Sequence, residues 1–132
     1  MKTSGIKASA ETKSRLKKLV AIAESLPEAE AVPQGRTGEH RILRVGKKSF
    51  GYYCFDHHGD GRIALWCKAA PGELGRLVAE NPRRYFVPPY VGPKGWIGVR
   101  LDQRSVSWTE IAYLLRTAYR LSAPRALAAR LD

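Results

Sequence analysis

SFGYYCF at residues 49–55 and RIALWCK at residues 62–68 are two apolar, aromatic-rich runs separated by a short break. Aromatic and β-branched residues favour extended backbone, and HHGDG at residues 57–61 contains the glycines of a turn. A third run, RILRV at residues 41–45, is joined to the first by Gly46-Lys47-Lys48, which is typical of a hairpin turn. The pattern therefore predicts three antiparallel strands in the middle of the chain.

Helical spacing of apolar residues surrounds these strands. Residues 12–26 carry one apolar stripe, which Pro27 ends, and a second helix is expected from Pro71 to Asn81. Ser107 and Glu110 fit a capping box, with Glu110 as a cap, before a third stripe that continues to the region of Pro124. The segment between the first helix and the strands, residues 27–40, contains two prolines and two glycines and is expected to be a polar connection.

The loop PPYVGPKGW at residues 88–96 leads into a further strand, IGVRLD, at residues 97–102. Alternation places Ile97, Val99 and Leu101 on a core-facing side and Trp96, Gly98 and Arg100 on the other. The prolines fix φ and the glycines permit positive φ, so such a loop is shaped by its turn residues. It is either a structural turn between a helix and a strand or a recognition loop.

The chain has 132 residues and is expected to form a single domain over residues 1–132, with residues 1–10 as a flexible basic N-terminus. No apolar run approaches the length of a membrane span and no hydrophobic signal region follows the start, so we expect a cytoplasmic protein. Cys54 and Cys67 lie within strand-like runs and are interpreted as reduced core thiols.

Short connections and hairpin signals predict an α+β protein, a two-layer sandwich with an antiparallel sheet and helices on one face. Several pieces of sequence in this order are similar to the MmcQ/YjbR family of small bacterial proteins. They are GKKSF at 46–50, LWCK at 65–68 with PGEL at 71–74, Asn81-Pro82, Phe86, Pro89-Tyr90, Gly95-Trp96-Ile97 and AYRL at 118–121. The resemblance implies an α-β3-α-β2-α order, a likeness to secretion-chaperone domains, and DNA binding, and it brings no catalytic motif.

The charge balance is the main functional signal. There are 23 Lys and Arg against 12 Asp and Glu, a formal net charge of +11, and such a field attracts polyanions, although it also serves solubility. We expect non-enzymatic, sequence-tolerant nucleic-acid binding, to DNA before RNA, by cations that neutralise phosphates and exposed aromatics that stack on bases. The candidate residues are Arg83, Arg84, Tyr90, Lys94, Trp96, Arg116 and Arg120.

Other readings of the same residues stay open. Trp66 is favoured as a core residue, and the histidines at 57 and 58, beside Asp56 and Asp60, are interpreted as a solvated turn in preference to a metal site. No nucleotide loop, nucleophile elbow or zinc motif is present, so neither a catalytic residue nor a cofactor nor a metal is expected. The alternative function is a protein- or small-ligand-binding module, and the chain is expected to be a monomer or weak dimer.

Overall fold

The computed structural model describes residues 7–131, which contain one six-stranded antiparallel sheet in the order β1-β2-β3-β4-β6-β5. The strands are β1 (Ala29–Gln34), β2 (His40–Val45), β3 (Lys48–Phe55), β4 (Ile63–Cys67), β5 (Tyr85–Phe86) and β6 (Ile97–Arg100). The helices are α1 (Ala10–Glu24), α2 (Glu73–Glu80), α3 (Trp108–Arg120) and α4 (Arg125–Ala128), with 3-10 turns η1 (His57–Gly59), η2 (Gly92–Lys94) and η3 (Ala129–Leu131). The expected flexible N-terminus falls mostly on residues 1–6, outside the described residues.

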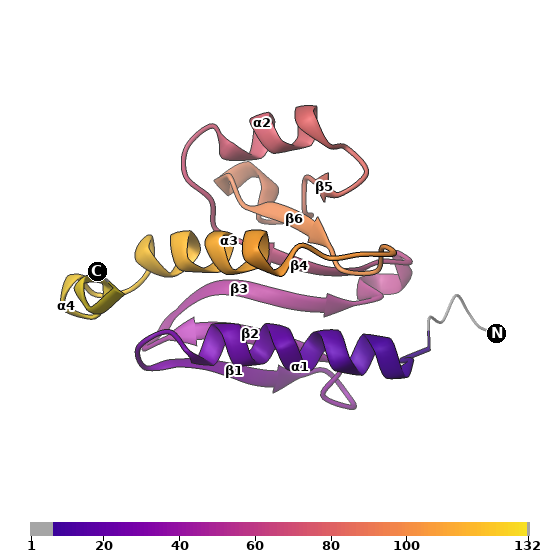
Figure 1. Cartoon of the computed structure of the whole chain (residues 1–132), viewed down its shortest axis with the longest axis horizontal. Coiled ribbons are helices and arrows are strands. Elements are labelled where there is room, and N and C mark those ends of the chain that lie inside the picture. Colours follow the sequence, from indigo (N-terminus) through magenta and orange to yellow (C-terminus); the bar gives the residue numbers. More distant parts are fainter. Residues whose placement is uncertain (1–6, 132) are drawn as a thin grey trace.

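The helices α1 and α3 lie side by side across one face of the sheet (Figure 1). Their inward side chains, among them Leu19 and Leu115, join Phe50 and Leu65 of the sheet in one continuous core. The hydroxyl of Tyr119 in α3 donates to the Pro27 carbonyl at 2.7 Å, which ties α3 to the segment after α1. The predicted two-layer α+β architecture with helices on one face is confirmed.

The central hairpins form as the sequence predicts, with one irregularity. Gly46 adopts a left-handed φ of 60° in the two-residue turn between β2 and β3. The pairing shifts between Leu43 and Arg44, and this bulge lets both Phe50 and Tyr53 of β3 point into the same core. Ile97 and Val99 of β6 are buried in that core, as their alternation predicted.

The polar connection expected before these strands is instead partly the strand β1, so the helix is followed by four strands and not three. Pro33 and the following glycines suggested a loop. However, β1 pairs only with β2 and forms the edge of the sheet, where a missing N–H breaks no ladder when it faces outward. The edge position therefore explains why proline is tolerated here.

The ends of the helices differ from prediction in detail. The helix α1 ends at Glu24 instead of residue 26, and Pro71 precedes α2, whose cap is Gly72. The Ser107 hydroxyl accepts from the Glu110 N–H at 3.3 Å, which confirms the cap of α3. The Glu110 carboxylate does not complete the capping box, because it accepts the Tyr85 hydroxyl and lies 3.4 Å from Arg84.

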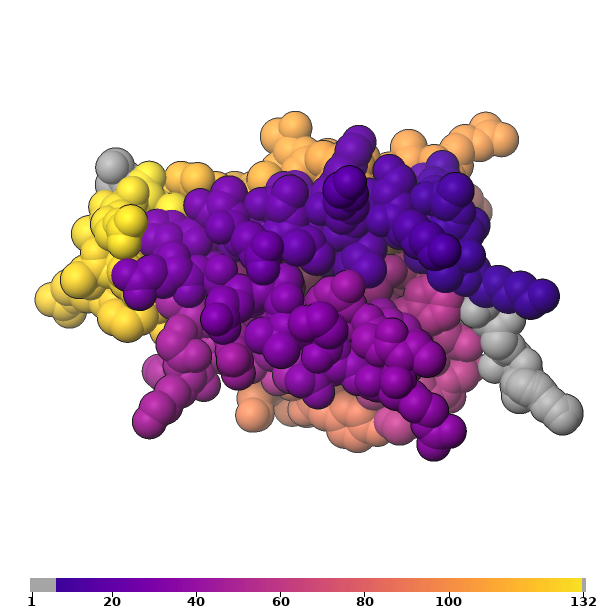
Figure 2. Space-filling model, turned by 90° about the horizontal axis from the view of Figure 1, so that it is seen from below, coloured from indigo at the N-terminus to yellow at the C-terminus, as the bar shows by residue number. Residues whose placement is uncertain are grey.

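The face of the sheet opposite the helices carries a second, smaller apolar cluster. Its buried members are Cys54, Ala64, Trp66 and Trp96, with Tyr52, Phe86 and Val91 packed against them. Viewed toward the β1 edge, α1 runs along one side of the molecule, and the salmon-to-orange segment that follows β5 emerges on the opposite side (Figure 2). We call this opposite side the helix-free face. None of the helices in the described part of the chain has the length and apolar composition needed to cross a membrane.

Candidate functional site

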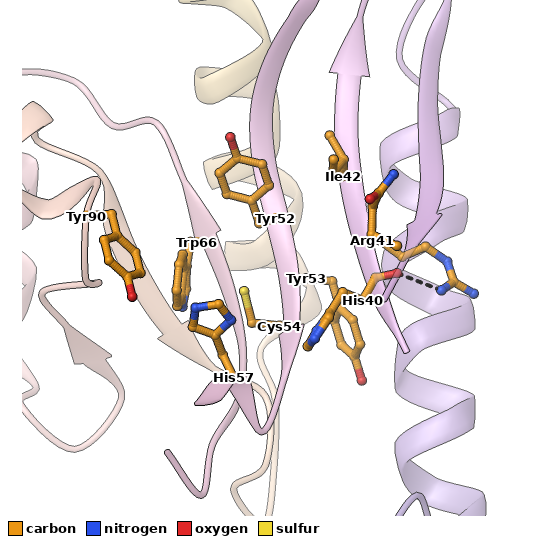
Figure 3. Close-up of a pocket in the computed structure, with 10 residues that line it drawn as sticks. His40, Arg41, Ile42, Tyr52, Tyr53, Cys54, His57, Trp66 and Tyr90 are labelled. Atoms are coloured by element: carbon orange, nitrogen blue, oxygen red, sulfur yellow. Dashed lines mark hydrogen bonds between the residues drawn. The ribbon is translucent and has the colours of Figure 1, made fainter. Parts of the chain in front are cut away.

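A hollow of about 260 Å³ opens on the helix-free face. Trp66 and His57 line one side of it, His40 and Ile42 line the other, and Cys54 lies between them (Figure 3). Because these side chains come from β2, β3, β4 and η1, the sheet and the β3–β4 turn together shape the hollow. Its lining is mainly aromatic and aliphatic.

The β3–β4 turn that carries His57 is held by its own aspartates. The Gly61 N–H donates to the Asp56 carboxylate at 2.8 Å and the Arg62 N–H donates to Asp60 at 2.9 Å. Asp56 and His58 have left-handed φ values of 49° and 52°, a conformation that non-glycine residues rarely adopt. This strained turn places the His57 ring edge-on to Trp66 at a centroid distance of 5.0 Å.

Two polar atoms at this contact have no hydrogen-bond partner within the described part of the protein. They are Nε1 of Trp66 and Nε2 of His57, both inaccessible at the atom concerned. Trp66 as a whole is 4% exposed. A buried polar atom without a partner lowers the stability of the folded protein by about 1–3 kcal/mol. Each of these two nitrogens would therefore gain from a further hydrogen bond.

The protonation states favour binding over acid–base chemistry. Burial lowers the pKa of His57, the nearby His58 and His40 lower it further, and only Asp60 opposes them, so the imidazole is neutral near pH 7. Burial raises the pKa of the Cys54 thiol to about 12, with a smaller contribution from Asp60, which keeps it protonated and weakly nucleophilic. The hollow is therefore bordered by a neutral imidazole and an indole, and Arg41 is a charged residue in its lining.

His40 on the other side of the hollow is also fixed. Its Nδ1 accepts the Phe55 N–H at 3.0 Å, so the ring proton resides on Nε2, which lies 3.6 Å from the Glu39 carboxylate. Between residues 7 and 131 no group of three or more His, Cys, Asp or Glu side chains gathers in a geometry that could hold a metal.

The loop at residues 88–96 borders the hollow through Tyr90. The Val91 N–H donates to the Pro89 carbonyl at 2.7 Å and the Gly92 N–H to the Pro88 carbonyl at 3.0 Å, so the loop is tightly folded. Tyr90 nevertheless has a φ of 65° and a ring that is 71% exposed, 6.1 Å from the His57 ring. The loop is thus a structural turn that also presents an exposed aromatic ring beside the hollow.

Cations flank the aromatic side chains on the helix-free face. The Arg62 guanidinium lies 4.1 Å from the centre of the Phe86 ring, and alternation along β4 takes Arg62, Trp66 and Lys68 to the same face. The pKa of Lys68 is lowered, first by partial burial and then by the charges of Lys48 and Lys94, so each of these two lysines is close enough to Lys68 to repel it. No carboxylate pairs with any of the three lysines within the described residues.

The seven candidate residues from the sequence do not form one patch. Tyr90 and Lys94 lie in the loop beside the helix-free face, whereas Arg116 and Arg120 are exposed on α3, in the helix layer. Trp96 is only 6% exposed and stacks on Tyr52, so the prediction of an exposed stacking ring at Trp96 is wrong.

The two arginines before β5 differ from each other. Arg84 is half-buried and pairs with Glu110, while Arg83 is exposed and uses its carbonyl to accept the Gln103 amide at 2.8 Å. Arg83 is therefore available to a phosphate, and Arg84 already has a carboxylate partner.

Sequence reasoning missed the main feature of the hollow. His57 was interpreted as part of a solvated turn, but its Nε2 is buried against Trp66. The run from Asp56 to Gly61 held a usable signal, since two aspartates and two glycines can fold a turn tightly enough to bury a side chain. Trp66 itself is buried, as predicted, and both cysteines are buried and free.

This arrangement defines a class of small α+β protein with an open antiparallel sheet covered by helices on one face only. The family model described as YjbR matches residues 24–121, and the chain belongs to the YjbR family. A crystal structure of Deinococcus radiodurans protein DR2400, with a domain named DUF419, is similar with a TM-score of 0.67 and 22% identity, covering 88% of this chain and 86% of that one. At that identity the likeness concerns the fold alone. None of the curated proteins matches the chain.

Proposed function

We propose that the chain is a non-enzymatic nucleic-acid-binding protein that binds an unpaired strand on the helix-free face of its sheet, with little sequence preference. The observation that carries this proposal is that Arg62 and Lys68, which adjoin the two ends of β4, and Lys94 lie on or beside the same face as the exposed Tyr90 ring. Cations beside an exposed aromatic ring match the phosphates and bases of a single strand.

Lys68 and Lys94 add positive charge at the same face. Lys48 and Lys94 each repel Lys68, and none of the three has a carboxylate partner in residues 7–131, so a phosphate near Lys68 would relieve an unfavourable interaction. The formal charge of +11 adds a long-range attraction for any polyanion. Contacts of this kind position a strand without reading its sequence.

A single strand is favoured over a duplex because of where the aromatic rings are. Tyr90 is exposed beside the hollow, and stacking on an unpaired base contributes about 1–3 kcal/mol per base. Bases in a duplex are stacked on each other and do not offer their faces to a side chain. The described residues of the helix-free face also carry no helix that could enter a major groove.

Fluorescence anisotropy with a labelled 12-nucleotide DNA strand, its duplex and the matching RNA strand, each at 50 and 200 mM salt, tests the proposal. The discriminating variants are two charge-matched pairs. Lys68→Gln with Lys94→Gln removes two cations from the helix-free face, and Arg116→Gln with Arg120→Gln removes two from the helix layer.

We expect the lysine pair to weaken single-strand binding and to reduce the slope of log affinity against log salt by about 1.4, or about 0.7 for each lost phosphate contact. The arginine pair should change the slope much less. Equal effects of the two pairs would reject the helix-free face as the site, and an absence of binding by the wild-type protein at 50 mM salt would reject the function itself.

A further inference from the structure

Two of the three buried side-chain polar atoms that lack a hydrogen-bond partner in residues 7–131 belong to residues that line the hollow beside Tyr90. These two atoms, Nε1 of Trp66 and Nε2 of His57, belong to rings that meet edge to face at 5.0 Å (Figure 3). Native proteins rarely leave two such atoms unpaired in one place. Both atoms are closed to solvent where the two rings meet, so a ligand in the hollow that parts this contact would supply the missing hydrogen bonds.

The chemistry of these atoms restricts the ligand. An indole N–H can only donate, so the ligand must bring a hydrogen-bond acceptor to Trp66. A neutral imidazole offers one donor and one acceptor nitrogen, so the group near His57 is polar but need not be charged. The described lining contains no carboxylate and no lysine.

The rest of the hollow restricts the shape of the ligand. Tyr52, Ile42 and the protonated Cys54 thiol line it, and the exposed Tyr90 ring stands at its border. Aromatic and aliphatic walls favour a flat apolar body, because such a body can lie against ring faces. Arg41 also lines the hollow, and its Nη1 donates to the Gly38 carbonyl and, at 2.9 Å, to the His40 carbonyl.

We propose that the hollow binds one planar heteroaromatic ring that presents a hydrogen-bond acceptor to the Trp66 indole N–H, with its other polar edge toward His57. Two sources have this chemistry, a base of a nucleic-acid strand and a free heterocyclic compound such as a nucleoside. The inference rests on the proposed function for the first source, since a strand on the helix-free face brings its bases to the hollow.

The test compares three probes of the full chain: a 12-nucleotide DNA strand, an abasic strand of the same length and charge, and free nucleosides. The variant is Trp66→Phe, which keeps an aromatic ring and removes the N–H, and the matched control is Trp108→Phe in the helix layer. We expect Trp66→Phe to weaken binding of the base-containing strand roughly three- to tenfold, as for loss of one hydrogen bond, and to leave the abasic strand unaffected.

The indole N–H resonances of the wild-type protein give a readout that does not depend on a folded variant. The Trp66 signal should shift on addition of the base-containing strand, and the Trp108 signal should not. Equal affinity for abasic and base-containing strands, with no shift at Trp66, would overturn the base pocket and leave phosphate-driven binding intact. Nucleosides that shift Trp66 while neither strand binds would reject the proposed function and support a free heterocycle as the ligand. No shift with any probe would overturn the inference.

Discussion

The rings of Tyr52 and Trp96 stack on the helix-free face with their centroids 5.2 Å apart and 19° between their planes. Tyr52 lies on β3 and Trp96 enters β6, so the stack reaches over the intervening β4. Two strands that share no hydrogen bonds are thereby joined by aromatic packing. The pair is part of the protein's apolar structure, whereas Tyr90 on the same side is exposed.

Replacing Trp96 by alanine should therefore destabilise the protein. Loss of a buried, stacked indole is expected to lower the free energy of unfolding by about 3–5 kcal/mol, as for other large-to-alanine changes in cores. Urea denaturation followed by circular dichroism measures it. Tyr113→Ala is the control, because its ring is 59% exposed on α3 and should change stability by less than about 1 kcal/mol. A loss at Trp96 no greater than at Tyr113 would contradict the stacked arrangement.

Tyr90→Gly should separate stability from binding. Tyr90 has a left-handed φ of 65°, which costs a non-glycine residue about 1–2 kcal/mol and costs glycine little. Because the ring is mostly exposed, little packing is lost, and the free energy of unfolding should stay the same or rise. The binding free energy for a single strand should nevertheless become less favourable by about 1–3 kcal/mol, because one ring that can stack on a base is lost.

The two quantities for Tyr90→Gly come from urea denaturation and from anisotropy with the labelled strand. Tyr90→Phe keeps the ring and the strained backbone, so it should bind as the wild type does. If Tyr90→Gly binds a strand with unchanged affinity, Tyr90 is not a stacking residue.

Gly98→Ala should disturb the helix-free face through Phe86. A Cβ at position 98 would lie 2.5 Å from two atoms of the Phe86 ring, closer than real Cβ contacts. The Arg62 guanidinium also packs 4.1 Å from the centre of the Phe86 ring, so the ring cannot move away freely. We therefore expect Gly98→Ala to lower the free energy of unfolding by about 1–3 kcal/mol. In a double-mutant cycle by urea denaturation, Phe86→Leu should recover part of the loss. Additive effects of the two changes would contradict direct contact between these positions.

The sequence predicted the fold well because its signals are local. Alternation in residues 97–102 and the aromatic runs on either side of η1 specify strands and their inward faces without knowledge of the partner strands. The strand β1 escaped prediction because proline is compatible with an edge, and edge position is a property of the whole sheet. Glu110 was expected to cap α3, and only tertiary packing brings Tyr85 to its carboxylate.

The candidate site was much less predictable, since it depends on which face each residue occupies. Arg116 and Lys94 are equally basic in sequence, but one lies on α3 in the helix layer and the other ends η2 beside the helix-free face. Trp96 carried the alternation of an outward residue, and it is outward from the main core. A second cluster on that face buries it, which a single strand's pattern cannot reveal.

The pH dependence of stability should report the environment of His57. Burial and the facing His58 and His40 lower the pKa of its imidazole below the ordinary 6.5, and Asp60 opposes this only weakly. The unfolded chain therefore binds a proton at His57 at a higher pH than the folded protein does. Below pH 6.5, unfolding is therefore coupled to uptake of a proton by His57. The contribution of His57 to stability is fully present above its pKa in the unfolded chain, and it is lost as the pH falls through its lower pKa in the folded protein.

His57→Gln removes this titration while keeping a polar side chain in the hollow. We expect the free energy of unfolding of the wild-type protein, measured relative to that of His57→Gln, to decrease as the pH falls from about 8 to about 5. Carboxylates such as Asp102 titrate in both proteins, so their contributions cancel in the difference. His58→Gln is the control, because His58 is exposed. It should remove only the repulsion by His58, and the larger effect of burial on the His57 pKa should remain. If the difference in unfolding free energy stayed constant or grew in acid, the His57 imidazole would be solvated in the folded protein. Its Nε2 would then be within reach of water.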